Sequence, residues 1–312
     1  MKFYKIFCIA FFGLFISVGF AQKSKINKAN RQYKNFAYIK TSEILLEVAK
    51  EGHKSIDLFE KLGDSYYFNN KMEDAIKWYG ELMMLNDVID PEYYYRYAQA
   101  LKYQENYAES DIWMKKFYEL KTDSDKGKAF ASAIDYVPLI EEESKDFEVK
   151  NLEFNSAVSD FGTTKFNDQL IYASAKGTGK DYNWNEQPFL DLMVVSMQED
   201  DSTYMNAESY DSAINTKYHE STAAFMSDGQ MMFFTRNNYF NKKLKSDRDD
   251  NVNLKIYRAI LQEEGEWGEI EPVHFNDDGY SVAHPSISAA GDRMYFSSDM
   301  PGTEGESDLY VA

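Results

Sequence analysis

The chain has 312 residues, of which 44% are hydrophobic and 16% aromatic, and its formal net charge is −18. Such a composition can bury sizeable cores. The acidic surface that it implies repels phosphate groups, so nucleic acids and anionic lipids are disfavoured as partners.

The first 21 residues have the features of a secretory signal peptide. Lys2 and Lys5 precede an apolar run over residues 6–20, and Ala21 is a small residue at which cleavage is expected. An uncleaved membrane anchor is the alternative, but the run is shorter than the roughly 20 residues that span a bilayer. The only cysteine, Cys8, lies in this segment, so the exported chain is expected to lack disulfides and cysteine metal ligands.

Residues 22–143 are predicted to form a helical domain with an internal repeat. Small residues recur 34 and 35 positions apart at two sites, and larger residues mark the turn between two helices. The small residues are Ala29, Gly63 and Ala98, then Thr41, Ala75 and Ser110, and the turn markers are Tyr38, Met72 and Tyr107. Paired helices approach closely only where side chains are small, so the period predicts tetratricopeptide-type units stacked as an α-solenoid.

Several helix boundaries can be predicted from capping residues. Ser55 and the pair Asp90-Pro91 are typical of helix starts. A further helix over residues 123–137 is expected to end near Pro138, and the acidic residues 141–146 are expected to form a solvated connector to a second domain.

A run of tyrosines in the third unit contains the candidate partner-binding residues. Tyr94 and Tyr97 have the helical spacing of core positions, so we expect them between helices. Tyr93, Tyr95 and Tyr103 are the candidates for a peptide-binding face, with a simple surface role as the alternative.

Residues 144–312 are predicted to be β-structure. Tyr172, Phe234 and Phe296 lie 62 residues apart in the strand-like runs QLIYASA, QMMFFTR and RMYFSSD, and a partner strand is expected after each, at DLMV, KIYR and DLYV. The run FEVKNLEF, over residues 147–154, reads as an earlier strand. The repeat predicts the blades of a β-propeller, with material for two to three blades where a closed propeller has 4 to 8.

Turn signals precede these runs. Gly229 and Gly291 supply the positive φ that a tight hairpin requires, and Asn167 lies at the corresponding place in the first copy.

The run HPSISAAGDRMYFSSDMPGTEGESDLYV, from His284, resembles the WD-like propeller repeat of TolB and its relatives. Together with helical pairs such as KLGDSYYFNNKMEDAIKWYGEL and PEYYYRYAQALK, it makes the chain similar to OmpA-family envelope proteins of the Bacteroidota. The resemblance implies a signal peptide, tetratricopeptide repeats, a propeller and a C-terminal OmpA-like domain that binds peptidoglycan. Members of the family often accompany outer-membrane proteins linked to type IX secretion and gliding.

None of these residues corresponds to the OmpA-like domain. The chain is expected to be a fragment with an incomplete β-propeller, because an open array would leave strand edges unpaired; the alternative is that something else completes the blades. Peptidoglycan binding is expected only through the missing C-terminal domain.

No catalytic, cofactor-binding or metal-binding residue is predicted. His219 and His284 fall near equivalent positions of two blades, where hydrogen bonding at a turn is favoured over a ligand role. Residues 176–181, KGTGKD, superficially suggest a phosphate loop, but Asp181 stands where Ser or Thr must meet magnesium.

An alternating run, Asp247, Asp249, Asn251 and Asn253, could present oxygens to calcium. It lacks the glycine and the bidentate glutamate of an EF-hand loop, so a solvated loop is favoured.

These patterns favour a non-enzymatic periplasmic scaffold, associated with the outer membrane, that binds protein partners through its repeats. The parent protein is expected to link an outer-membrane or type IX secretion complex to peptidoglycan. No cofactor, nucleic acid or transmembrane span of the mature chain is expected. The alternative is a periplasmic propeller enzyme, a peptidase or glycan-active protein, that uses the helical domain for recruitment.

Overall fold

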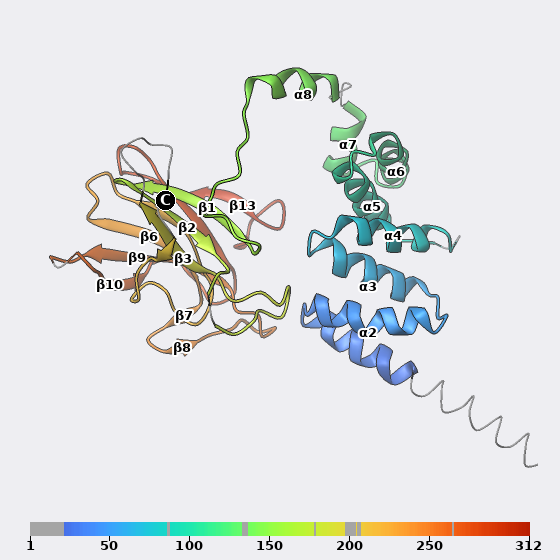
Figure 1. The fold of residues 1–312 in the computed structure, drawn as a ribbon, viewed down its shortest axis with the longest axis horizontal. Coiled ribbons are helices and arrows are strands. Elements are labelled where there is room, and N and C mark those ends of the chain that lie inside the picture. The colour runs from blue at the N-terminus through green and yellow to red at the C-terminus, as the bar shows by residue number, and fades with distance from the viewer. Residues whose placement is uncertain are drawn as a thin grey trace, which may run out of the picture. The chain divides into compact units, whose positions relative to one another are not determined.

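The structure is a computed structural model that describes residues 22–85, 88–132, 137–177, 179–196, 204, 207–263 and 265–312. The predicted signal peptide lies outside the described residues. The described residues fall into two compact units, one within residues 1–148 with 183–186 and the other within residues 149–182 with 187–312. Helices build the first unit and antiparallel sheets the second, so the predicted order of a helical region followed by a β region is confirmed (Figure 1).

The described part of the first unit contains three helix pairs followed by shorter helices. The first described helix covers residues 22–34. The next are α2 (Tyr38–Lys50), α3 (Ile56–Tyr67), α4 (Met72–Met83), α5 (Pro91–Tyr103), α6 (Tyr107–Leu120), α7 (Asp125–Ser132), α8 (Val137–Glu143) and the 3₁₀ turn η1 (Ser144–Asp146).

The turn inside each pair has the same backbone conformation at all three places. Phe36, Asn70 and Glu105 have φ angles of 54°, 57° and 59°. The amide after each of them donates to the carbonyl five residues earlier, always at 2.9 Å. Tyr38, Met72 and Tyr107, the predicted turn markers, are the first residues of α2, α4 and α6. The helix pairs therefore repeat with the predicted period.

The six small residues of the repeat are all buried. Two of them touch across a helix pair, because the Ser110 hydroxyl donates to the Ala98 carbonyl at 2.8 Å. At Gly63 a Cβ atom would lie 2.2 Å from the Tyr79 ring. The helices thus approach most closely where the sequence places the small side chains.

The predicted caps are present, whereas one helix end is wrong. Ser55 Oγ accepts from the Leu58 amide at 3.2 Å, and Asp90 Oδ1 accepts from the Glu92 amide at 2.9 Å. Pro138 does not end a helix: it is the second residue of α8, where a missing N–H costs nothing. The acidic residues 141–146 are exposed, as predicted, but helical.

Residues 183–186 also belong to the helical unit. The Trp184 indole N–H donates to the Phe68 carbonyl at 3.1 Å. Its ring stacks on Phe36 at 5.8 Å between centroids and meets the Tyr38 ring edge-on at 4.8 Å. Two aromatic side chains and one backbone carbonyl thus hold Trp184 in place.

The described part of the second unit contains three antiparallel sheets and a small hairpin. The first sheet has the order β1 (Asp160–Phe166), β2 (Gln169–Ser174), β3 (Asp191–Ser196), β4 (Glu208–Ser209). The second has the order β10 (Trp267–Pro272), β9 (Leu254–Leu261), β6 (Met231–Asn237), β5 (Glu220–Phe225). The third has the order β11 (Val282–Ile287), β12 (Met294–Ser298), β13 (Asp308–Val311).

The hairpin, β7 (Tyr239–Phe240) with β8 (Lys243–Leu244), lies between β6 and β9 in the chain. Its two turn residues, Asn241 and Lys242, have φ angles of 50° and 64°. Two consecutive positive φ values are typical of the tightest hairpin turns.

The three sheets share their pairing and their irregularities. Tyr172, Phe234 and Phe296 are buried on β2, β6 and β12, the second strand of each sheet in chain order. The predicted partner strands pair with these strands as β3, β9 and β13. In chain order, the first strand of each sheet (β1, β5 and β11) has a bulge that contains a residue with a positive φ. The turn that follows each of these strands also contains a residue with a positive φ. The bulge residues are Gly162, Thr222 and His284, and the turn residues are Asn167, Gly229 and Gly291.

One strand expectation is wrong. Residues 147–154 form no strand, and Val149 is 93% exposed. The alternating pattern there includes Phe154, which is buried against Tyr172 at 5.0 Å between ring centroids. This segment therefore contributes the buried Phe154 and the partly buried Leu152 to the core rather than a paired strand.

Candidate functional site

A buried carboxylate, Asp64, lies at the centre of a hydrogen-bond cluster in the helical unit. Its side chain is 1% exposed. It accepts from the Tyr33 hydroxyl at 2.5 Å, the Tyr79 hydroxyl at 2.7 Å and Arg96 Nη1 at 2.7 Å. A buried carboxylate is tolerated only with such donors. The donors come from the first helix, α4 and α5, so this Asp64 cluster joins all three helix pairs.

The donors of the Asp64 cluster have raised pKa values and therefore stay protonated. Burial, followed by the neighbouring Asp64 carboxylate, raises the pKa of Tyr33, Tyr79 and Tyr93. Burial alone would lower the pKa of the Arg96 guanidinium, but the charge and hydrogen bond of Asp64, together with Tyr79 and Tyr93, raise that pKa overall. These groups remain donors at ordinary pH, which suits a cluster that fixes helix positions.

Arg96 extends the cluster to the surface. The guanidinium carbon lies 5.1 Å from the Phe68 ring centroid and 5.4 Å from that of Tyr93, and Nε is 3.7 Å from the Glu92 carboxylate. About a fifth of the side chain, 22%, is exposed. An arginine held by rings and carboxylates is a rigid donor for an incoming carbonyl or carboxylate.

The five tyrosines of interest have different surroundings. Tyr94 and Tyr97 are buried at 6% and 7% exposure, which confirms the prediction that they lie in the core. Tyr93 is half-buried, with its hydroxyl 3.4 Å from the Asp64 carboxylate. Tyr103 is 58% exposed at the end of α5.

Tyr95 packs within the third helix pair. Its ring lies 5.5 Å from that of Phe117, and Lys126 Nζ is 4.2 Å from its centroid. Of the candidates, Tyr93 thus borders the Asp64 cluster, Tyr95 packs against α6 and α7, and Tyr103 faces solvent.

Sequence reasoning missed Asp64 and Arg96. Two signals were present: an acid directly after the small residue Gly63, and a single arginine inside a tyrosine run. Neither signal identifies the partner, since the donors to Asp64 lie 31 residues before it and 15 and 32 residues after it.

A buried ion pair lies in the second sheet. Glu220 and Arg236, with side chains 0% and 5% exposed, approach to 3.0 Å. Arg236 also donates to the carbonyls of Ala213 and Ile214. Burial raises the pKa of Glu220 to about 7, although Arg236 opposes that shift.

The two candidate histidines have hydrogen-bonding roles, as favoured from the sequence. His219 Nδ1 accepts from the Leu190 amide at 3.0 Å, and burial lowers its pKa to about 4. His284 Nδ1 lies 3.2 Å from the Thr222 hydroxyl oxygen. The expectation that they occupy near-equivalent positions is wrong, because Thr222 is the bulge residue that corresponds to His284.

Two loops considered for ligand binding are held by hydrogen bonds within the protein. Asp247 accepts from the amides of Asp249 and Asn251, both at 2.9 Å. In the KGTGKD segment, Lys176 Nζ donates to the Phe154 carbonyl at 2.8 Å. Thr178 of that segment lies outside the described residues.

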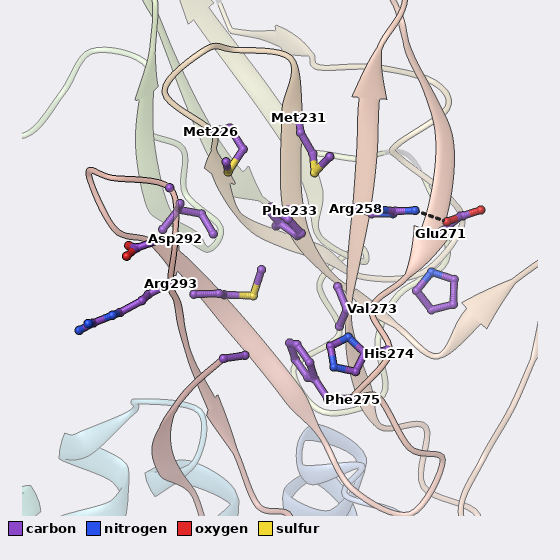
Figure 2. Close-up of a pocket in the computed structure, with 15 residues that line it drawn as sticks. Met226, Met231, Phe233, Arg258, Glu271, Val273, His274, Phe275, Asp292 and Arg293 are labelled. Atoms are coloured by element: carbon purple, nitrogen blue, oxygen red, sulfur yellow. Dashed lines mark hydrogen bonds and ion pairs between the residues drawn. The ribbon is translucent and has the colours of Figure 1, made fainter.

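A cavity of about 550 Å³ lies between the second and third sheets (Figure 2). Apolar side chains, among them Met226, Met231 and Phe233, form much of its wall. The ion pair of Arg258 with Glu271, at 2.7 Å, lies at its rim.

The preceding pair of sheets contains a counterpart of this cavity. There the Trp267 indole lies 6.2 Å from the Phe166 ring and 5.9 Å from that of Phe225, between centroids. By strand pairing, Met226 and Ile287 correspond to Phe166 and Phe225, and both line the cavity. The cavity is therefore lined by Met226 and Ile287, the two residues that correspond to the rings packed against Trp267 in the preceding pair of sheets.

Among the described residues, no group of three or more His, Cys, Asp or Glu side chains is arranged to hold a metal ion. The helices of the described ranges are too short or too polar to cross a lipid bilayer. Comparison with protein-family models gives no match, and comparison with curated proteins gives no significant match.

Proposed function

We propose that this chain is a non-enzymatic scaffold that binds protein partners, with tetratricopeptide-type helix pairs followed by propeller-type blades. The observation that carries the proposal is the repetition of backbone geometry, one turn at Phe36, Asn70 and Glu105, and one bulge at Gly162, Thr222 and His284. Stacked repeats of this kind generate extended surfaces suited to binding other proteins.

The location and partners follow from the sequence resemblance. The apolar N-terminal segment and the likeness to OmpA-family envelope proteins favour a periplasmic protein at the outer membrane. We propose outer-membrane or type IX secretion proteins as partners, with a parent protein that reaches peptidoglycan through an OmpA-like domain outside residues 1–312.

Site-specific cross-linking tests the scaffold. A photoreactive phenylalanine analogue at Tyr103, which is exposed, would be activated in envelope fractions of the source bacterium. We expect a defined envelope protein to be cross-linked, and excess unmodified chain to compete with it. The same background pattern from a photoreactive residue at the exposed control position Asp125 would contradict the proposal.

A propeller enzyme is the second candidate, and the cavity between the second and third sheets favours it. The apolar wall would suit substrate binding, and the rim pair Arg258–Glu271 would be its polar group. Turnover of peptide or glycan substrates that is lost in Glu271→Gln would support this candidate over the scaffold.

A further inference from the structure

A second pocket lies in the helical unit, lined by α2, α4, Phe59 and the loop before α3. Its volume is about 270 Å³. Phe59 and Trp78 form the floor, with their rings stacked at 5.9 Å between centroids, and they are 2% and 8% exposed. Leu46 and Ala49 of α2 complete the apolar lining. We refer to it as the Trp78 pocket.

The rim of the Trp78 pocket is basic. Lys50, Lys54 and Lys77 surround it, and the only acid among its lining residues is Glu81, which pairs with Lys54 at 3.3 Å. Lys77 Nζ lies 4.9 Å from the Trp78 ring centroid. The charge at this rim is opposite in sign to the net charge of the chain, which is −18.

We propose that the Trp78 pocket binds an acidic segment of a partner protein, which inserts one aromatic or aliphatic side chain between Leu46 and Trp78. This inference deepens the proposed scaffold function and rests on it. The volume suits a single large side chain, and a buried aromatic floor is typical of an interface hot spot. The lysines then pair with carboxylates that flank the inserted side chain.

Charge complementarity selects this occupant over others. A basic segment would place like charges against three lysines, and a neutral one would leave them unused. Polyanions such as nucleic acids meet the same lysines but are repelled by the acidic remainder of the chain. A short acidic segment with one apolar anchor satisfies both the floor and the rim.

A designed peptide tests the Trp78 pocket directly, with the protein prepared as residues 22–312, without the predicted signal peptide. The probe is a capped ten-residue peptide with one Phe among Glu and Asp residues, titrated by calorimetry and by NMR of the Trp78 indole N–H. We expect saturable binding that shifts this resonance and weakens with salt. Replacing the Phe by Ala, or the acids by Lys, should abolish it. Shifts confined to other parts of the chain would overturn the proposal.

Charge-reversal variants provide the matched comparison. Lys50→Glu with Lys77→Glu should weaken the acidic peptide about tenfold or more. It should also admit a basic peptide with the same Phe. Lys28→Glu with Lys115→Glu changes the net charge equally at exposed sites away from the pocket and should change affinity by less than about twofold. Equal losses in both double variants would refute a specific site.

Filling the pocket separates steric from electrostatic effects. Ala49→Phe should block the peptide while the thermal unfolding and helical circular dichroism stay close to the unmodified chain. Retained peptide binding in that folded variant would overturn the inference. If Ala49→Phe and the lysine variants still cross-link the same envelope protein, the pocket proposal fails and the scaffold stands. If no variant cross-links any partner, the scaffold itself fails.

Discussion

Gly63 of α3 and Tyr79 of α4 are packed so closely that a Cβ atom on residue 63 would lie 2.2 Å from the Tyr79 ring. The same approach brings the Tyr79 hydroxyl to the carboxylate of the adjacent Asp64, at 2.7 Å. A glycine in the middle of a helix normally lowers stability, so its presence here reflects packing.

Gly63→Ala should therefore destabilise the helical unit, by about 1–3 kcal/mol, despite the better helix propensity of alanine. Gly80 of α4 is the matched control, because a Cβ atom there would be 3.4 Å from the Tyr97 hydroxyl oxygen. Gly80→Ala should be neutral or stabilising by up to about 1 kcal/mol. Urea unfolding followed by helical circular dichroism measures both. Equal effects of the two substitutions would contradict the packing argument.

Asp64→Asn should be strongly destabilising, since it removes the buried counter-ion of the Arg96 guanidinium and leaves only the more exposed Glu92 carboxylate nearby. We expect a loss of about 3 kcal/mol or more in the free energy of unfolding. Glu92→Gln removes a carboxylate 3.7 Å from the same guanidinium but more exposed, and should cost less than about 1 kcal/mol. A small effect of Asp64→Asn would mean that the cluster does not hold the helix pairs together.

His219 should give the β unit an acid-sensitive stability. Its pKa is about 4 in the folded chain against an ordinary 6.5, so the unfolded chain takes up a proton that the folded chain refuses. Stability is therefore lost as the pH falls from 6.5 towards 4, by up to about 3 kcal/mol.

Glu220, the next residue, opposes this effect. Burial raises its pKa from 4.5 to about 7, so its contribution is present below pH 4.5 and is lost as the pH rises through 7. The two contributions partly cancel between pH 4.5 and 6.5.

His219→Asn keeps a hydrogen-bond acceptor for the Leu190 amide but cannot titrate. In this variant the unfolding free energy should fall steadily from pH 4.5 to 7, whereas the unmodified chain should change little up to pH 6.5. The Trp267 indole N–H, followed by NMR in urea, reports on the β unit alone. Parallel pH curves for the two chains would exclude the assigned role of His219.

Ile287→Phe should stabilise the β unit by about 1 kcal/mol, because it adds apolar volume at the cavity between the second and third sheets. Phenylalanine already occupies the corresponding position, Phe225, of the second sheet. Trp267→Leu, at the filled counterpart, should cost about 2–4 kcal/mol and remove the 2.7 Å hydrogen bond to the Tyr210 hydroxyl. Thermal unfolding measures both changes. A destabilised Ile287→Phe chain would show that the cavity cannot accept a ring.

The repeats could be predicted from the sequence because their signals are local. Small residues at the helix crossings and aromatic residues on the second strands recur at fixed spacing, and both sets are buried. The glycine turns were also predictable, since Gly229 and Gly291 have φ angles of 70° and 72°.

The predictions that were wrong concerned segments whose structure depends on distant parts of the chain. Residues 147–154 alternate like a strand but pair with no strand among the described residues. Pro138 lies in the first turn of α8, where the backbone N–H that proline lacks would have no intrahelical partner. The Asp64 cluster is assembled from residues 15 to 32 positions apart, whereas Glu220 and Arg236 are direct cross-strand partners in the β5–β6 hairpin. Periodicity does not encode which distant donor meets a buried carboxylate.

The β7–β8 hairpin has a practical consequence for protein engineering. It is inserted between β6 and β9, which pair directly with each other over residues 231–237 and 254–260. Its tip, Asn241 and Lys242, is therefore a permissive site at which an epitope tag or fluorescent label can be placed. A labelled chain of this kind would allow the protein to be followed in living cells while both repeat regions stay intact.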